Sequence, residues 1–278
     1  MAEELQMSPE TRTIQVNGTS LSVFIQGEGP DVLLVHGFPD SHTSWRHQIP
    51  ALVAAGYRVI APDTRGCGES AISLAVSDYH VSNLVADLVA MLDALAIEKV
   101  RLVGHDWGAA ICWQLVLAHP ERVDRYVALS VGHPTAYARG GLLQKLKGYY
   151  ILFLQLRGIS EFLLTRWNWL GFRWMTRYPP EMDHWRATLG RPGRLTAALN
   201  YYRANLDLPF SRNNPPATVP VLGIWSSEDI ALAERQMLET EKYVQAPFQY
   251  RRIDHAGHWL QLDAPDEVNP ILLEYLRQ

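Results

Sequence analysis

A single carboxylate stands between two glycines in the stretch VGHDWGAA (103–110). Asp106 occupies the middle of a G-x-D-x-G pattern, where the better known G-x-S-x-G pattern has a nucleophilic serine. The apolar run before it and the helical spacing after it predict a sharp strand-to-helix turn, which Gly104 and Gly108 would permit. A helix start favours an anion, so this turn would present an ionised carboxylate. Alone, the pattern leaves two other interpretations, a serine turn that lost its nucleophile or an ordinary turn.

Two further residues follow Asp106 in an order that suits nucleophilic catalysis. Asp229 comes after the apolar run 219–225, and His258 comes after the run 248–253. Nucleophile, acid and histidine in this chain order are typical of one large class of hydrolases. Each residue also has a structural interpretation, because an Asp often caps a helix and a buried His can be purely structural. His255 competes with His258, and the G-H-W context favours His258.

The loop after the first buried run supplies a fourth element. His36, Gly37, Phe38 and Pro39 follow the apolar residues 31–35 directly. A backbone amide in such a loop can donate to a developing oxyanion. Reactive groups gather at the carboxyl ends of strands in an open parallel sheet, so we expect all four elements to meet there.

The elements that would position these residues alternate between strands and helices. Short, continuous apolar runs are typical of strands buried on both faces, and an Asn-Gly pair joins the first two runs as a hairpin. The predicted strands are 11–16, 21–26, 31–36, 57–62, 100–105, 125–130, 219–225 and 248–253. The predicted helices between and after them are 43–55, 81–95, 107–118, one near 232–244 and one from Asp266. This alternation predicts an α/β fold with a mostly parallel, doubly wound sheet.

A helical insertion interrupts the alternation. Residues 134–212, here called the cap segment, are aromatic and rich in Arg, and they carry 12 Lys/Arg against 4 Asp/Glu, a net charge of +8. The rest of the chain carries 13 against 25, a net charge of −12. The predicted cap helices are 142–156, 159–167, 172–178, 180–188 and 194–205. We therefore expect a core made of 1–133 and 213–278 with a helical cap of 134–212 inserted in it.

Composition excludes several classes of function. The 278 residues have a formal net charge of −4, which gives no reason to expect a nucleic-acid partner. The first ten residues are acidic and lack the apolar run of a signal peptide, and no uncharged run approaches the ~20 residues of a membrane span. The two cysteines, Cys67 and Cys112, suggest no disulfide framework, and Cys112 falls on a predicted buried helix face. These features predict a soluble, cytoplasmic protein.

Four stretches together carry a family resemblance. HGFPD (36–40), DTRGCGES (63–70), GHDWGA (104–109) and GHW (257–259) resemble the epoxide hydrolases of the α/β-hydrolase fold, over nearly the whole chain. The resemblance implies that fold with an inserted helical cap. It implies Asp106 as nucleophile, His258 as general base and Asp229 as the acid that orients it. It also implies a cis peptide before Pro39 and an oxyanion hole made by the amides of Phe38 and Trp107, with no metal or cofactor.

The same resemblance implies that two tyrosines of the cap take part in the reaction. YYILFLQLRG (149–158) and ALNYYRANL (198–206) look like the epoxide hydrolase segments in which one Tyr each donates to the oxirane oxygen. Aligning Y-x-x-x-x-Q and N-aromatic-Y-R selects Tyr150 and Tyr202, with Tyr149 and Tyr201 as the adjacent alternatives. A phenol with a pKa near ~10 is protonated at neutral pH and can donate both a hydrogen bond and a proton.

The expected reaction adds water to an epoxide and yields a vicinal diol through a hydroxyalkyl ester on Asp106. Haloalkane dehalogenase is the alternative with the same triad, but many of those enzymes have a halide-binding Asn at the position of Phe38. Fluoroacetate dehalogenases have an Arg at the position of Trp107. A non-catalytic ligand-binding protein of this fold would lack an element that is present here. A conventional esterase would carry Ser in place of Asp106.

Further expectations concern the pocket. Phe38, Trp107 and Trp259 would line it, and Asp40 with His105 would help to position the hydrolytic water, since relatives carry Glu at the position of Asp40. A turn or helix-cap role is the alternative for Asp40. The aromatic-rich cap suggests an apolar pocket for an aryl or alkyl epoxide, although most of its aromatics would form cap core and some would form a homodimer patch. The cap aromatics in question are Trp167, Trp169, Phe172, Trp174 and Tyr178.

Overall fold

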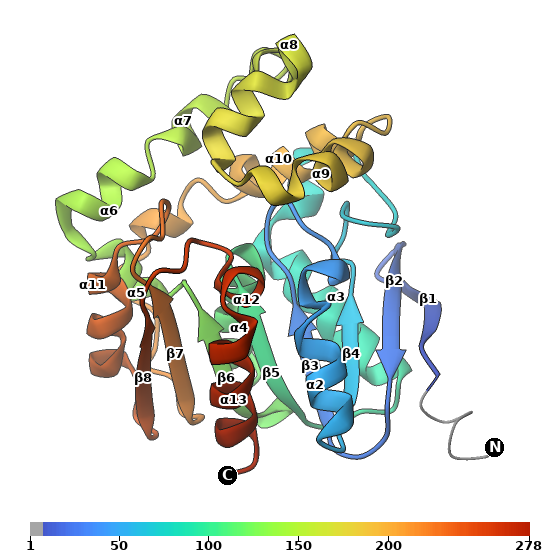
Figure 1. Cartoon of the computed structure of the whole chain (residues 1–278), viewed down its shortest axis with the longest axis vertical. Helices are drawn as coiled ribbons and strands as arrows, with labels where there is room; N and C mark the ends of the chain where they lie inside the picture. The colour runs from blue at the N-terminus through green and yellow to red at the C-terminus, as the bar shows by residue number, and fades with distance from the viewer. Residues whose placement is uncertain (1–7) are drawn as a thin grey trace.

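An eight-stranded sheet forms the centre of the molecule in the computed structural model, which describes residues 8–278. Its strand order is β1-β2-β4-β3-β5-β6-β7-β8, and Figure 1 shows it beneath a group of helices. The strands are β1 (Glu10–Val16), β2 (Thr19–Gln26), β3 (Asp31–Val35), β4 (Arg58–Pro62), β5 (Val100–His105), β6 (Val123–Leu129), β7 (Val221–Ser226) and β8 (Phe248–Ile253). The eight predicted strands and the α/β fold are thereby confirmed.

The sheet is mostly parallel, as predicted. All pairs from β4 through β3, β5, β6 and β7 to β8 are parallel, whereas β2 is antiparallel to both β1 and β4. The β1–β2 hairpin turns at Asn17 and Gly18, which both have positive φ angles of 42° and 74°. Such angles are typical of the Asn-Gly hairpin turn that the sequence predicted.

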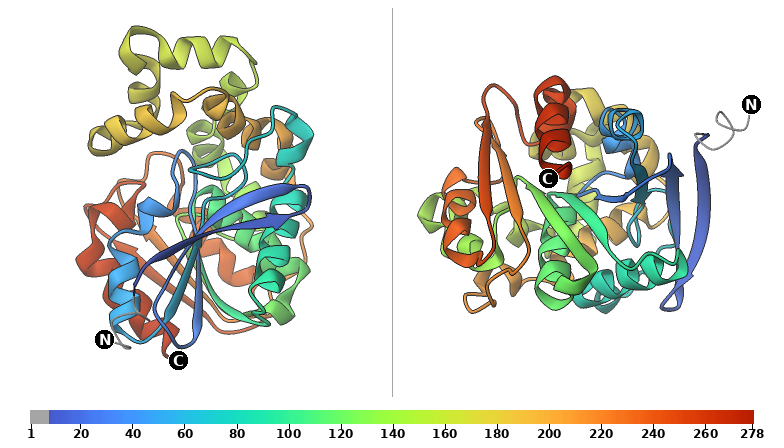
Figure 2. Two further views of the ribbon diagram at one scale, coloured as in Figure 1. Left: turned by 90° about the vertical axis from the view of Figure 1, so that its right-hand side faces the viewer. Right: turned by 90° about the horizontal axis from the view of Figure 1, so that it is seen from below.

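Alternate residues of each central strand face two separate cores. Leu33 and Val35 of β3 pack in one core with α3 (Val81–Ala94) and α4 (Trp107–Ala118). Val32 and Leu34 pack in the other with α2 (Gln48–Ala54) and α13 (Pro265–Leu276). Figure 2 shows these helices on opposite faces of the twisted sheet. Burial on both faces explains why the strands read as continuous apolar runs.

Six helices lie between β6 and β7, above the carboxyl ends of the strands (Figure 1). They are α5 (Pro134–Ala138), α6 (Gly141–Lys147), α7 (Tyr150–Leu154), α8 (Ile159–Thr176), α9 (Met182–Leu189) and α10 (Arg194–Ala204). The predicted helix 142–156 is broken in two at Gly148, whose amide closes α6 on the Gln144 carbonyl. Helix α8 joins two predicted helices across a kink at residues 166–169. The limits of the cap as a domain, 134 and 212, stay a prediction.

Two core helices also differ from their predicted ranges. The segment 43–55 starts as a 3₁₀ helix at His42–Trp45 and becomes α2 only at Gln48. Pro50 explains the break, because it has no amide proton to donate to the carbonyl four residues earlier. The segment near 232–244 divides into α11 (Glu234–Leu238) and a 3₁₀ helix, and a short α12 (Leu260–Asp263) precedes α13.

The predicted absence of a signal peptide concerns the first ten residues, and residues 1–7 of these lie outside the described residues. Within residues 8–278, none of the helices combines the length and the apolar character that crossing a membrane requires. Both cysteines are free and buried, and Cys112 has no exposed surface, as its predicted helix face requires.

Candidate active site

Asp106 lies at the turn between β5 and α4 with a positive φ of 51° and ψ of −123°. The sequence predicts that the flanking glycines adopt the unusual backbone angles of the turn, but in the structure Asp106 itself adopts them. The glycines are needed for space instead. A Cβ atom at Gly108 would lie 2.1 Å from the Val35 carbonyl oxygen, and one at Gly104 would lie 2.8 Å from the Ala109 Cα. Gly108 therefore lies too close to β3, and Gly104 too close to α4, for a side chain at either position.

The loop after β3 reaches the Asp106 carboxylate. The Phe38 amide donates a hydrogen bond of 2.8 Å to Asp106 Oδ1, and the Phe38–Pro39 peptide is cis, as the resemblance implied. A backbone hydrogen bond from Trp107 also lowers the pKa of Asp106. The two amides expected to form an oxyanion hole thus both act on this carboxyl group.

His258 lies between the two carboxylates that the sequence selected. Its Nδ1 is 2.9 Å from Asp229 Oδ2, and its Nε2 is 3.4 Å from Asp106 Oδ2. The other Asp229 oxygen accepts the amides of Ala231 and Leu232, each at 2.8 Å. His255 is exposed and has no part in this arrangement. The three ends of β5, β7 and β8 therefore bring Asp106, Asp229 and His258 together as the chain order predicted.

The buried charges of Asp106, Asp229 and His258 shift one another's pKa values toward the charged forms. Burial alone raises the pKa of Asp106, but the hydrogen bond and charge of His258 hold that pKa below its usual value. Asp229 has a lowered pKa for the same reason, with burial again opposed by His258. Burial lowers the pKa of His258, yet the charges of Asp229 and Asp106 together raise it. These shifts favour two ionised carboxylates around a protonated His258 ring.

His105, together with two residues that the sequence did not single out, supports the loops that carry His258 and Asp229. His105 Nε2 lies 2.8 Å from the His258 carbonyl oxygen, and His105 Nδ1 lies 3.2 Å from Gln261 Nε2. The Lys147 ammonium group donates to the Asp229 carbonyl oxygen. Gln261 lies three residues beyond His258, but nothing in its sequence context marked it as a support. Both ring nitrogens of His105 therefore have protein partners in this structure.

Asp40 connects the cap segment to the histidine loop. One carboxylate oxygen accepts the Trp185 indole at 2.8 Å, and the other accepts the Trp259 indole at 3.0 Å. Burial raises the pKa of Asp40 to about 7, although both indole hydrogen bonds oppose the shift. The helix-cap alternative fails, because Ser41 caps the next helix. The water-positioning role of Asp40 and His105 stays a prediction, and the contacts seen here are structural.

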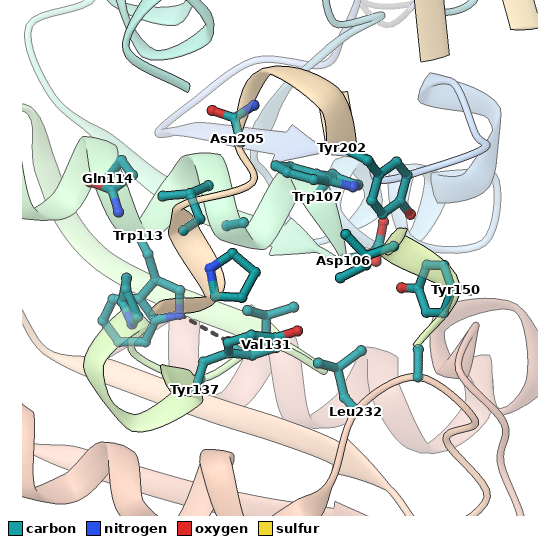
Figure 3. A pocket seen from close by; sticks show the side chains of 17 residues that line it. Asp106, Trp107, Trp113, Gln114, Val131, Tyr137, Tyr150, Tyr202, Asn205 and Leu232 are labelled. Atoms are coloured by element: carbon teal, nitrogen blue, oxygen red, sulfur yellow. Dashed lines mark hydrogen bonds between the residues drawn. The ribbon is translucent and has the colours of Figure 1, made fainter. Parts of the chain in front are cut away.

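The two selected cap tyrosines flank Asp106, and their neighbours do not. Figure 3 shows Tyr150 and Tyr202 beside Asp106, and their ring centroids are 5.8 Å apart. Burial, together with the charge of Asp106, raises the pKa of both phenols well above the usual value. Tyr201 instead donates to the Arg65 carbonyl at 2.6 Å, and Tyr149 is 55% exposed. The structure therefore separates each pair of adjacent tyrosines, which the alignment alone could not do.

Two cavities meet at Asp106. Both are lined by Asp106, Tyr150 and Tyr202. The first, of about 100 Å³, is mostly apolar and is drawn in Figure 3; it continues past Val131, Pro134, Tyr137, Leu208 and Leu232. The second, of about 280 Å³, passes Phe38, His258 and Trp259 and reaches Leu146, Lys147, Tyr149 and Arg177. The predicted pocket residues Phe38 and Trp259 line the second cavity, and Trp107 lines the first.

The five cap aromatics singled out in the sequence lie away from the two cavities. None of the five aromatics singled out in the sequence lines either cavity at Asp106. Phe172 is fully buried in the cap core, whereas Trp167 and Trp174 are exposed. The apolar lining comes instead from α4, α5, α7 and the loops after β6 and β7. Among residues 8–278, no group of three or more His, Cys, Asp or Glu is placed to hold a metal ion.

Comparison with known proteins agrees with this geometry. A family model described as alpha/beta hydrolase fold matches residues 30–265. Epoxide hydrolase A of Mycobacterium tuberculosis is 34% identical, over 97% of this chain and 98% of its own. The AB hydrolase superfamily protein YfhM of Bacillus subtilis is 33% identical, over 95% and 96% of the two chains. The crystal structure of Epoxide Hydrolase A from Mycobacterium thermoresistibile superposes with a TM-score of 0.81 at 32% identity, over 97% and 98%.

Proposed function

Because the chain belongs to the α/β-hydrolase fold family, we propose that it is an epoxide hydrolase that uses Asp106 as its nucleophile. One observation carries the proposal. A buried, ionised Asp106 faces two protonated phenols, Tyr150 and Tyr202, across a shared cavity. An oxirane placed between them would meet a nucleophile on its carbon and acids on its oxygen.

In the first step, a carboxylate oxygen of Asp106 forms a bond to one oxirane carbon, and the carbon–oxygen bond of the ring breaks. Tyr150 and Tyr202 donate to the departing oxygen, which takes a proton and becomes a hydroxyl group. The lowered pKa of Asp106 keeps the nucleophile ionised without a base. The product of this step is a hydroxyalkyl ester of Asp106.

In the second step, His258 takes a proton from a water molecule, whose oxygen attacks the ester carbonyl of Asp106. Esterification has by then removed the negative charge of Asp106, one of the charges that raise the pKa of His258. The pKa of His258 therefore falls, and its proton passes through solvent to the phenolate that the first step left, so that a neutral imidazole is present when a base is required. Asp229 still orients the ring through Nδ1. The amides of Phe38 and Trp107 hold the oxyanion, and the diol leaves with a proton from His258. The Asp106 carboxyl group then gives its proton to His258, which restores the resting site.

The apolar cavity supports an aryl or alkyl epoxide as substrate. Val131, Tyr137 and Leu232 line it beyond the reacting carboxylate. Such walls favour a hydrocarbon substituent and offer few polar partners to a charged one. The residues named here account for both steps without a cofactor.

A single turnover in ¹⁸O-labelled water with styrene oxide tests the proposal. We expect an unlabelled first diol and one ¹⁸O atom in the peptide that contains Asp106, because water attacks the enzyme's own carbonyl. Label in the first diol would contradict the ester. His258→Asn is the companion variant, in which we expect the protein mass to increase by one substrate and hydrolysis to stop. Release of halide from chloroalkanes, without diol from styrene oxide, would favour a dehalogenase.

A further inference from the structure

The outer edge of the cap segment exposes an unusual amount of apolar surface. Of the 18 large apolar side chains that are exposed among the described residues, 12 lie between Leu142 and Trp174. Ten of them lie on helices α6, α7 and α8, and the other two, Tyr149 and Leu156, lie in the links between these helices. Figure 1 shows the three helices in sequence along the outer edge of the cap. We call this surface the cap ridge. The side chains of Leu142 and Leu152 are 72% and 69% exposed, so the ridge presents a large apolar area to solvent.

The ridge is also strongly basic. Residues 139–177 contain seven Lys or Arg and a single acidic residue, Glu161. Arg203 from α10 pairs with Glu161 at 2.8 Å, which leaves the ridge without a free carboxylate. Within residues 8–278, none of the seven basic side chains forms an ion pair. Lys147 donates to the Asp229 carbonyl oxygen, and the charges of the other six are available to an external anion.

Arginines and aromatic rings alternate on α8. The Arg166 guanidinium lies 4.8 Å from the ring centre of Phe162, and the Arg177 guanidinium lies 5.6 Å from that of Trp174. Exposed aromatic rings beside basic groups fit the boundary between lipid headgroups and acyl chains, where the ring enters the apolar layer and the cation stays at the phosphates. We propose that the cap ridge binds the surface of a membrane that contains anionic lipid.

Charge favours a membrane over a second copy of this chain. Two ridges brought face to face would oppose seven basic groups to seven, with one acid on each side. The chain outside residues 134–212 has a net charge of −12, which would attract a ridge, but it offers only four exposed large apolar side chains among the described residues. An anionic bilayer supplies both the opposite charge and an apolar layer. The acidic core would then face away from the membrane.

The ridge adjoins the entrance to the site. Leu146 and Tyr149 belong to the exposed apolar set, and both line the cavity that reaches Asp106 and His258. Lys147 and Arg177 line the same cavity. A protein that rests on this surface would open its cavity toward the bilayer, where an apolar epoxide accumulates. Membrane binding would thus deliver substrate as well as hold the protein.

Sedimentation of the full chain with lipid vesicles tests the proposal. We expect binding to vesicles of phosphatidylglycerol and phosphatidylcholine to be at least about tenfold stronger than to phosphatidylcholine alone, and to be lost in 0.5 M salt. Arg166→Glu with Arg173→Glu, and separately Phe162→Ser with Trp174→Ser, should each weaken binding about tenfold or more. Arg251→Glu and Leu238→Ser remove comparable exposed groups far from the ridge in sequence, and they should change binding by less than about twofold.

Thermal unfolding and turnover of a water-soluble epoxide without vesicles show whether each variant is folded. Both measurements should match those of the parent protein, because no substituted residue lines the cavity at Asp106. Absence of binding to anionic vesicles would overturn the proposal. Equal losses in ridge and control variants would also overturn it. A dimer that the ridge variants dissociate, without any vesicle binding, would show that a second copy covers the ridge.

Discussion

Replacing Asp40 with Asn should change how the stability of the protein depends on pH. Asp40 is buried between the Trp185 and Trp259 indoles, and burial raises its pKa to about 7. In the unfolded chain this carboxyl group has a pKa near ~4. A raised pKa in the folded state means that the folded protein keeps a proton which the unfolded chain has lost. Stability from this group therefore falls as the pH rises from about 4 to about 7, and changes little above that range.

The size of the effect follows from the same pKa. At pH 5 the folded carboxyl group lies about two pH units below its midpoint, and each unit corresponds to about 1.4 kcal/mol, so this group contributes about 3 kcal/mol that is absent at pH 8. Asn cannot ionise and has no such dependence. The free energy of unfolding of the parent minus that of Asp40→Asn should thus decrease by about 3 kcal/mol from pH 5 to pH 8.

Urea unfolding at pH 5 and pH 8 measures this difference directly. Asp183→Asn is the matched control, because the Asp183 side chain is 93% exposed at the start of α9 and should show a difference that is constant within about 0.5 kcal/mol. An Asp40→Asn difference that is equal at both pH values would refute the raised pKa. It would mean that the two indole hydrogen bonds outweigh the desolvation of the carboxylate.

Further predictions concern the phenols, the acid and the glycines. Tyr202→Phe should slow alkylation of the enzyme about 10²-fold in a rapid-quench experiment, whereas Tyr201→Phe should retain that rate and lose about 1–2 kcal/mol of stability, because its hydroxyl binds the Arg65 carbonyl. Asp229→Asn should lower kcat about 10³-fold by slowing ester hydrolysis, seen as accumulated alkyl-enzyme by mass spectrometry; no accumulation would count against its role. Gly108→Ala should cost about 3 kcal/mol or more by urea unfolding because of the Val35 carbonyl, whereas Gly148→Ala, with its nearest neighbour at 3.5 Å, should change stability by less than about 1 kcal/mol.

Local patterns were sufficient for the sheet and poor for the cap. A strand buried on both faces leaves a continuous apolar run, so all eight strands could be located from the sequence. The cap helices depend on packing over the core as well as on their own periodicity. The break at Gly148 was not predicted. An interruption between the predicted helices 159–167 and 172–178 was predicted, and the structure places it at residues 166–169. The predicted pocket residues Phe38, Trp107 and Trp259 do line the two cavities. Which cap aromatics are buried and which are exposed was not predictable, because exposed and buried aromatics look alike in a sequence.

The identity and order of Asp106, Asp229 and His258 were readable from the sequence, because each follows a strand and parallel strands end at one edge of the sheet. Adjacent tyrosines differ by one position along the chain, and on a helix that step turns the side chain by roughly 100°. Only the docking of α10 on the core decided that Tyr202 faces Asp106 while Tyr201 binds the Arg65 carbonyl. The roles of Asp40, His105 and Gln261 likewise came from partners distant in sequence, since no local pattern specifies which side chains a folded chain will bring together.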